Sequence, residues 1–214
     1  MKYSMWDRRR WVLGALAAAV AAPARAAEPV VLVLGDSLSA EYGLKRGTGW
    51  VRLLEARLAQ EKIAARVVNA SISGETTAGG RSRLPALLAQ HRPTHVVIEL
   101  GGNDALRGLP LSMTEDNLSQ MTLAAQQAGA RVLLVGMQLP PNYGREFGER
   151  FAALYDQVAR RHKAAAVPFF LKGFAEGPDA ARYFQPDRIH PTEEAQPLML
   201  ANVWPALKKL LSAK

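Results

Sequence analysis

The segment Pro29-Val-Val-Leu-Val-Leu-Gly-Asp-Ser-Leu-Ser-Ala-Glu-Tyr-Gly43 joins an apolar run to a run of small and polar residues. Residues 30–34 are all apolar and three of them are β-branched, which predicts a short strand buried on both faces and ended by a glycine. Asp36 and Ser37 would leave the sheet at its carboxyl edge, where open α/β sheets bind ligands. Ser37 is therefore a candidate nucleophile, although it or Ser39 could equally cap a following helix.

The rest of the chain alternates between strand and helix patterns. Apolar runs predict further strands at 65–68, 95–100, 131–135 and 167–170, and helical spacing predicts helices at 50–62, 77–90, 113–127, 149–164 and 192 to the end. Strands that alternate with helices indicate a parallel sheet with right-handed crossovers. The predicted fold is a three-layer α/β/α sandwich around a central five-stranded parallel sheet. Neither repeats nor an internal linker interrupts residues 27–214, which predicts a single domain.

Several finer features accompany these elements. Thr48 and Thr192 are expected to cap the first and last helices, and Pro85 to kink its helix or start it afresh. Leu123 is expected to face inward from the helix at 113–127. The loop at 136–144 is expected to be non-helical.

Residues 1–26 have the pattern of an export signal. Lys2 and the run Arg8–Arg10 form a basic start, residues 11–22 form a short alanine-rich apolar run, and Ala24-Arg25-Ala26 fits a small-x-small cleavage site. The apolar run is too short for a stable membrane span. We expect a cleaved signal, through either the twin-arginine or the Sec route, and a periplasmic or secreted protein. The alternative is an uncut N-terminal anchor.

Composition excludes several classes of function. Residues 1–26 hold five of the 27 basic and one of the 19 acidic residues, so the remaining chain has a net charge of +4. Its basic residues form no cluster interleaved with aromatic ones, and nucleic-acid binding has no support. The chain has no cysteine, which excludes disulfides, a cysteine nucleophile and thiolate metal sites. Phosphate-loop, dinucleotide and metal motifs are also missing, so we expect no cofactor and no metal.

Polar turns follow three predicted strands, at Asp36-Ser37, Ser73-Gly74 and Gly102-Asn103. In a parallel sheet these turns meet at one edge. A fourth polar group, Asp187-Arg-Ile-His190-Pro, precedes the last helix; its aspartate can fix the histidine tautomer and leave Nε2 to accept a hydroxyl proton. Taken singly, each element has an ordinary structural explanation as a turn, cap or surface residue.

Together the four blocks resemble the SGNH (GDSL) hydrolases. The matching blocks, in order, are Gly35-Asp-Ser-Leu-Ser39, Gly74 within Ser-Ile-Ser-Gly-Glu-Thr, Gly101-Gly-Asn-Asp104 and Asp187-x-x-His190-Pro. The resemblance covers essentially the whole chain after residue 26. Loop residues such as 40–43 and 138–144 are most similar to the thioesterase I / protease I / lysophospholipase group of arylesterases.

The resemblance implies a flavodoxin-like SGNH hydrolase fold and a serine esterase. Ser37 would be the nucleophile, His190 the base and then the acid, and Asp187 the orienting carboxylate. The oxyanion hole would consist of the backbone N–H groups of Ser37 and Gly74 and the side-chain amide of Asn103. The implied substrates are acyl esters and thioesters, including aryl esters, acyl-CoA-like thioesters and lysophospholipids.

Apolar residues in loops near Ser37 predict a shallow groove for an acyl chain. The predicted substrate-binding residues are Leu38, Leu106, Leu109, Leu139, Pro140 and Tyr143. Two alternatives stay open: a carbohydrate O-acetylesterase with the same catalytic residues, and a periplasmic binding module without chemistry. We expect a monomer that binds a small-molecule substrate. His91, His95 and His162 are expected to lie outside the site, with His162 on a solvated helix face.

Overall fold

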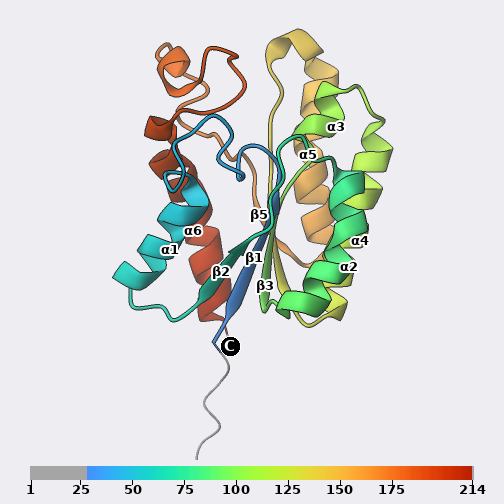
Figure 1. Ribbon diagram of the computed structural model, residues 1–214. Coiled ribbons are helices and arrows are strands. Elements are labelled where there is room, and N and C mark those ends of the chain that lie inside the picture. Colours follow the sequence, from blue (N-terminus) through green and yellow to red (C-terminus); the bar gives the residue numbers. More distant parts are fainter. Residues whose placement is uncertain (1–27, 214) are drawn as a thin grey trace, which may run out of the picture.

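Five strands form one parallel sheet in the computed structural model, which describes residues 28–213 (Figure 1). The order across the sheet is β2-β1-β3-β4-β5, so the first strand lies inside the sheet between the second and third. The predicted export signal lies outside the described residues. The strands are β1 Val30–Gly35, β2 Arg66–Asn69, β3 His95–Glu99, β4 Arg131–Val135 and β5 Ala165–Val167.

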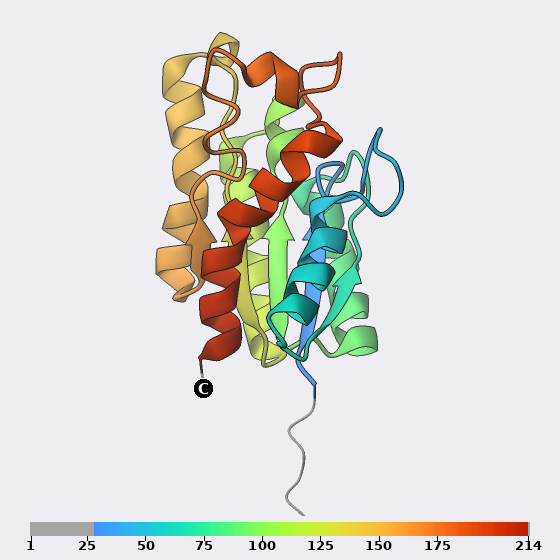
Figure 2. The ribbon, with the colours of Figure 1, turned by 90° about the vertical axis from the view of Figure 1, so that its left-hand side faces the viewer.

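Helices cover both faces of the sheet and make it the middle of three layers. Helices α1 and α6 lie on one face, and α2, α4 and α5 on the other (Figure 1). Figure 2 looks onto the face covered by α1 and α6. The α-helices are α1 Trp50–Gln60, α2 Thr77–His91, α3 Gly102–Leu106, α4 Leu111–Gln127, α5 Arg145–His162 and α6 Gln196–Ser212; the short 3₁₀ helices are η1 Pro141–Tyr143, η2 Ala180–Tyr183 and η3 Glu193–Ala195.

The apolar run in β1 is explained by burial on both faces. Val31 and Val33 pack into the core on the α1 and α6 side, whereas Leu32 and Leu34 pack into the core on the α2, α4 and α5 side. All four side chains are fully buried. Burial of each contributes about 1.5–3 kcal/mol to stability, which favours an interior position for β1 in the sheet, between β2 and β3. The predicted three-layer fold with a five-stranded parallel sheet is confirmed.

Most boundaries lie within two residues of the prediction, and the larger differences are in β5, in α5 and at the start of α6. β5 ends at Val167 rather than Phe170, because Pro168 has no N–H to continue the ladder. Helix α5 begins at Arg145 rather than 149, and the loop at 136–144 contains the short helix η1. Helix α2 continues through Pro85 without a new start.

The predicted threonine caps are wrong. Thr48 Oγ1 donates to the carbonyl of Lys45 instead, and the first amide of α1, on Trp50, donates to Gln196 Oε1. Thr192 is separated from α6 by η3, and its hydroxyl is buried without a hydrogen-bond partner among residues 28–213. The inward placement of Leu123 is also wrong, since 38% of this residue is exposed while α4 buries Leu118, Met121, Thr122 and Ala125.

Within residues 28–213, no helix combines enough length with enough apolar character to cross a membrane.

Candidate active site

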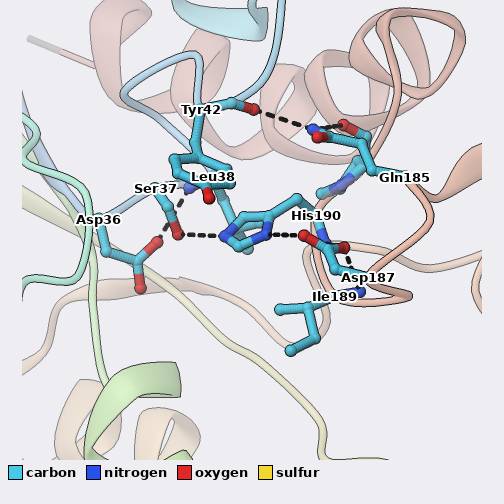
Figure 3. Close-up of polar contacts among 9 residues, drawn as sticks. Asp36, Ser37, Leu38, Tyr42, Gln185, Asp187, Ile189 and His190 are labelled. Carbon is cyan, nitrogen blue, oxygen red and sulfur yellow. Dashed lines mark hydrogen bonds and ion pairs between the residues drawn. The ribbon is translucent and has the colours of Figure 1, made fainter.

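Ser37, His190 and Asp187 lie in one hydrogen-bonded line at the carboxyl edge of the sheet (Figure 3). His190 Nε2 is 2.9 Å from Ser37 Oγ, and His190 Nδ1 is 2.7 Å from Asp187 Oδ2. Asp187 and Ser37 therefore contact different nitrogens of the imidazole ring. With the Nδ1 proton donated to the carboxylate, Nε2 has its lone pair directed at the serine hydroxyl.

The turn that carries Ser37 is held by the aspartate before it. Asp36 Oδ1 accepts from the backbone N–H of Leu38 at 3.0 Å, and the Asp36 carbonyl accepts from the amides of Ser39 and Ala40. A Cβ at Gly35 would lie 2.7 Å from Ser39 Oγ and 2.8 Å from Glu99 Oε2, so this approach requires glycine. Ser37 thus follows β1 on a tight turn that is held by hydrogen bonds to Asp36.

The carboxylate of Asp187 is held by hydrogen bonds from its own loop. Asp187 Oδ1 accepts from the backbone N–H groups of Ile189 at 2.9 Å and His190 at 3.0 Å, and Arg188, between Asp187 and Ile189, has a positive φ of 58°. Desolvation raises the pKa of Asp187, but the hydrogen bonds from the His190 and Ile189 amides and from the His190 ring outweigh it and lower the pKa to about 2. Asp187 is therefore ionised at neutral pH.

The loop after β2 and the start of α3 bring the predicted oxyanion-hole residues to the same edge of the sheet. Gly74 lies in a turn with φ of 78°, a conformation that favours glycine, and its carbonyl accepts from Arg107 Nη2 at 2.9 Å. Asn103 lies in α3, and its Nδ2 donates at 3.0 Å both to Asp36 Oδ2 and to the Glu75 carbonyl. Both hydrogens of this amide are engaged in the resting site, so donation to an oxyanion requires one of these bonds to be exchanged.

Asn103→Ala is expected to lower kcat by roughly 100- to 1000-fold, because one donor to the developing oxyanion is typically worth about 3–4 kcal/mol. Steady-state hydrolysis of a p-nitrophenyl ester measures this change, and the thermal unfolding midpoint monitors folding. Unchanged kcat in a folded variant would show that Asn103 is not an oxyanion-hole donor.

Two buried carboxyl groups beneath the serine were not identified from the sequence as a unit. Glu99, at the end of β3, is fully buried; its Oε2 accepts from Ser39 Oγ at 2.7 Å, and Ser39 Oγ accepts from Trp50 Nε1 at 3.1 Å. Burial, together with the charge of Asp36, raises the pKa of Glu99 well above its usual value. Burial also raises the pKa of Asp36 to about 6, against the hydrogen bonds from Leu38 and Asn103 and the proximity of His190.

Asp36 is expected to make stability fall as pH rises. The ordinary aspartate pKa is 3.8 and that of folded Asp36 is about 6, so between these values the folded chain holds a proton that the unfolded chain has released. The free energy of unfolding therefore decreases from about pH 4 to about pH 6, by on the order of 2–3 kcal/mol. Asp36→Asn removes this contribution. Urea unfolding of both proteins at pH 4 and pH 7 measures it; equal pH effects in the two would contradict the prediction.

The predicted substrate-binding residues do not share one environment. Leu38 is only 9% exposed and packs into the core on the α1 and α6 side, so it does not line an open groove. The turn at Ser37 directs it inward, which the sequence alone does not reveal. Leu106 and Pro140 are exposed, and Leu109, Leu139 and Tyr143 are half-buried.

The remaining histidines lie outside the Ser37 site. His95 begins β3, at the opposite edge of the sheet, where its ring bonds to Thr94 and to the Leu210 carbonyl. His91 ends α2. His162 ends α5, and its Nε2 is 2.5 Å from Ser119 Oγ of α4, so the predicted fully solvated face is corrected to a contact between helices. Within residues 28–213, no cluster of three or more His, Cys, Asp or Glu could hold a metal ion.

A parallel α/β sheet with a serine, a histidine and an aspartate in hydrogen-bonded series at its carboxyl edge defines a hydrolase of the serine type. Residues 33–197 match the GDSL-like lipase/acylhydrolase family. The chain belongs to this family, that of the SGNH hydrolases, and is a carboxylic ester hydrolase.

Similar proteins cover nearly the whole chain. Esterase TesA of Pseudomonas aeruginosa is 51% identical over 203 residues, which are 95% of this chain and 100% of that protein. Thioesterase 1/protease 1/lysophospholipase L1 of Escherichia coli K12 is 42% identical over 190 residues, 89% of this chain and 88% of that protein. A crystal structure of TesA is 54% identical, covers 85% of this chain and 99% of its own, and superposes with a TM-score of 0.81.

Proposed function

We propose that this protein is an exported serine esterase that hydrolyses acyl esters and thioesters through an acyl-enzyme, with Ser37, His190 and Asp187 as its catalytic residues. The observation that carries the proposal is the 2.9 Å contact between His190 Nε2 and Ser37 Oγ. The contact lies within the distance at which a base can abstract a hydroxyl proton, and the structure has it without any movement of the loops.

In the acylation step, Ser37 Oγ attacks the substrate carbonyl carbon while its proton moves to His190 Nε2. Asp187, with its low pKa, stabilises the imidazolium that results. The N–H groups of Ser37 and Gly74 and the amide of Asn103 would donate to the oxyanion. Collapse of the tetrahedral intermediate expels the alcohol or thiol, which takes the proton from His190. Water then attacks the acyl-serine by the same route in reverse and releases a carboxylic acid.

The substrate class follows from the relatives and from the rim of the site. The similar proteins are named esterase and thioesterase/protease/lysophospholipase. The loop side chains at this edge include exposed Leu106 and half-buried Leu139 and Tyr143, which suit an acyl chain better than a sugar. Short- to medium-chain acyl esters, aryl esters and thioesters are therefore the proposed substrates, ahead of acetylated carbohydrates and of a binding module without chemistry.

Hydrolysis of p-nitrophenyl esters from acetate to palmitate, beside an acyl-CoA and a lysophospholipid, tests the substrate class. We expect turnover of butyrate and longer esters and of the thioester. Turnover of acetylated sugars alone, without hydrolysis of butyrate or longer esters, would favour the carbohydrate O-acetylesterase instead. Failure of a fluorophosphonate to label Ser37 would favour the binding module.

Export is proposed from the basic and alanine-rich pattern of residues 1–26. The protein is expected in the periplasm or medium, with its chain starting near residue 27, as a monomer. Mass spectrometry of the purified mature protein and cell fractionation test the cleavage and the location.

A further inference from the structure

The ring of Tyr42 stacks on the imidazole of His190. The two ring centroids are 4.3 Å apart and the planes are inclined by 38° (Figure 3). Tyr42 follows the Ser37 turn in the chain and is 49% exposed, whereas the His190 side chain is only 18% exposed. One face of the proposed base is thus covered by an aromatic ring that itself borders solvent.

The loop that carries Tyr42 is tied to the loop that carries His190. Gln185 Nε2 donates to the Tyr42 carbonyl at 2.9 Å and to the Pro191 carbonyl at 3.2 Å. The approach is so close that a Cβ at Gly43 would lie 2.1 Å from Gln185 Oε1. The backbone of Tyr42 is therefore held against the residues on either side of His190.

A second set of bonds fixes the same loop from within. The Glu41 carboxylate accepts from the amide of Gly47 at 3.0 Å and from that of Gly49 at 2.8 Å, and Glu41 itself has a positive φ of 59°. Lys45 N donates to Glu193 Oε1 at 2.9 Å. The position of Tyr42 is thus determined by hydrogen bonds at several points of its loop, although the ring is half exposed.

We propose that Tyr42 is a positioning residue for His190, which holds the imidazole in line with Ser37 and stabilises it through the aromatic face when it takes the serine proton. This inference rests on the proposed function. A cation within about 6 Å of an aromatic centroid is attracted by the ring quadrupole. The imidazolium exists only after proton transfer, so the attraction acts on the acylation transition state rather than on bound substrate.

Three substitutions of Tyr42 distinguish the effects of its aromatic ring, its apolar volume and its hydroxyl group. Tyr42→Phe keeps the aromatic face and should retain kcat/KM within about 2-fold, since the attraction comes from the ring. Tyr42→Leu keeps apolar volume but loses the quadrupole and should lower kcat/KM by about 3- to 30-fold. Tyr42→Ala removes both the apolar volume over His190 and the aromatic ring, and should lower kcat/KM at least as much as Tyr42→Leu. Leu123→Ala is the control and should leave kcat/KM unchanged, because Leu123 is 38% exposed on α4, outside the Ser37 site.

The same variants are assayed with p-nitrophenyl butyrate and with ethyl butyrate, and the rate of Ser37 labelling by a fluorophosphonate is measured. We expect the loss in Tyr42→Leu to be equal for both esters and to appear in the labelling rate, with KM little changed. Wild-type kcat/KM in Tyr42→Leu would overturn the inference, as would an equal loss in Tyr42→Phe. A rise in KM confined to the aryl ester would overturn it in favour of substrate stacking. If the wild-type protein hydrolysed neither ester, the proposed function would fail instead.

Discussion

Ser37→Ala is expected to lower kcat/KM for ester hydrolysis by about 10⁴- to 10⁶-fold, because the covalent route is lost and only binding and oxyanion donors are left. Ser37 is half-buried, and its Oγ meets His190, so removal of one oxygen leaves the fold intact. Hydrolysis of p-nitrophenyl butyrate and covalent labelling by a fluorophosphonate measure the effect. Residual activity within 10-fold of wild type, about 1.4 kcal/mol of barrier, would exclude Ser37 as the nucleophile.

Ser39 gives the matched control for this substitution. It lies only two residues further along the chain, but its hydroxyl donates to Glu99 and accepts from Trp50 in the interior. Ser39→Ala should therefore keep fluorophosphonate labelling at Ser37 and lower the free energy of unfolding by about 1–3 kcal/mol, since the partners of the hydroxyl stay buried. Ser37→Ala is thus expected to change activity, whereas Ser39→Ala is expected to change stability.

Asp187→Asn is expected to lower kcat/KM by about 10⁴-fold with an unchanged fold. The asparagine amide can donate to His190 Nδ1, which favours the tautomer whose Nε2 carries the proton. That tautomer cannot accept the proton of Ser37. Measured kcat/KM values near neutral pH give the effect, and a change below 10-fold would show that Asp187 does not set the tautomer.

Matched substitutions away from the Ser37 site test whether these losses are specific. Asp179→Asn changes an exposed aspartate just ahead of η2, in the same long segment before α6, and should leave activity unchanged. Replacement of His91, His95 or His162 by glutamine should also leave kcat/KM largely intact. Inactivation by one of these histidine substitutions in a folded protein would mean that His190 is not the base.

The sequence predicts most of the architecture because its apolar pattern is strong where burial is complete. In β1, alternate side chains fill two different cores, so all of them must be apolar. The start of α5 is missed because Arg145 and Glu146 are exposed and add nothing to an apolar stripe. Thr48 fails as a cap because Gln196 Oε1 accepts from the Trp50 amide at the start of α1, and Thr192 fails because η3 separates it from α6.

The site is predictable in its residue types and less so in its supporting contacts. The turns after β1, β2 and β3 and the residues before α6 could be placed at one edge from the parallel topology alone. Glu99 was visible only as a charge in an apolar strand, because its partners Ser39 and Trp50 come from other parts of the chain. The contact between Tyr42 and His190 depends on loop conformations that no periodic pattern encodes.

The bond between Ser37 and His190 spans 153 positions in sequence. The proposed nucleophile follows the first strand and the proposed base precedes the last helix, so a partly folded chain whose C-terminal segment has not docked would hold Ser37 without His190. Recovery of esterase turnover during refolding should therefore follow the docking of these two distant segments rather than collapse or helix formation alone. Esterase turnover would therefore report when the two ends of the folded chain have come together.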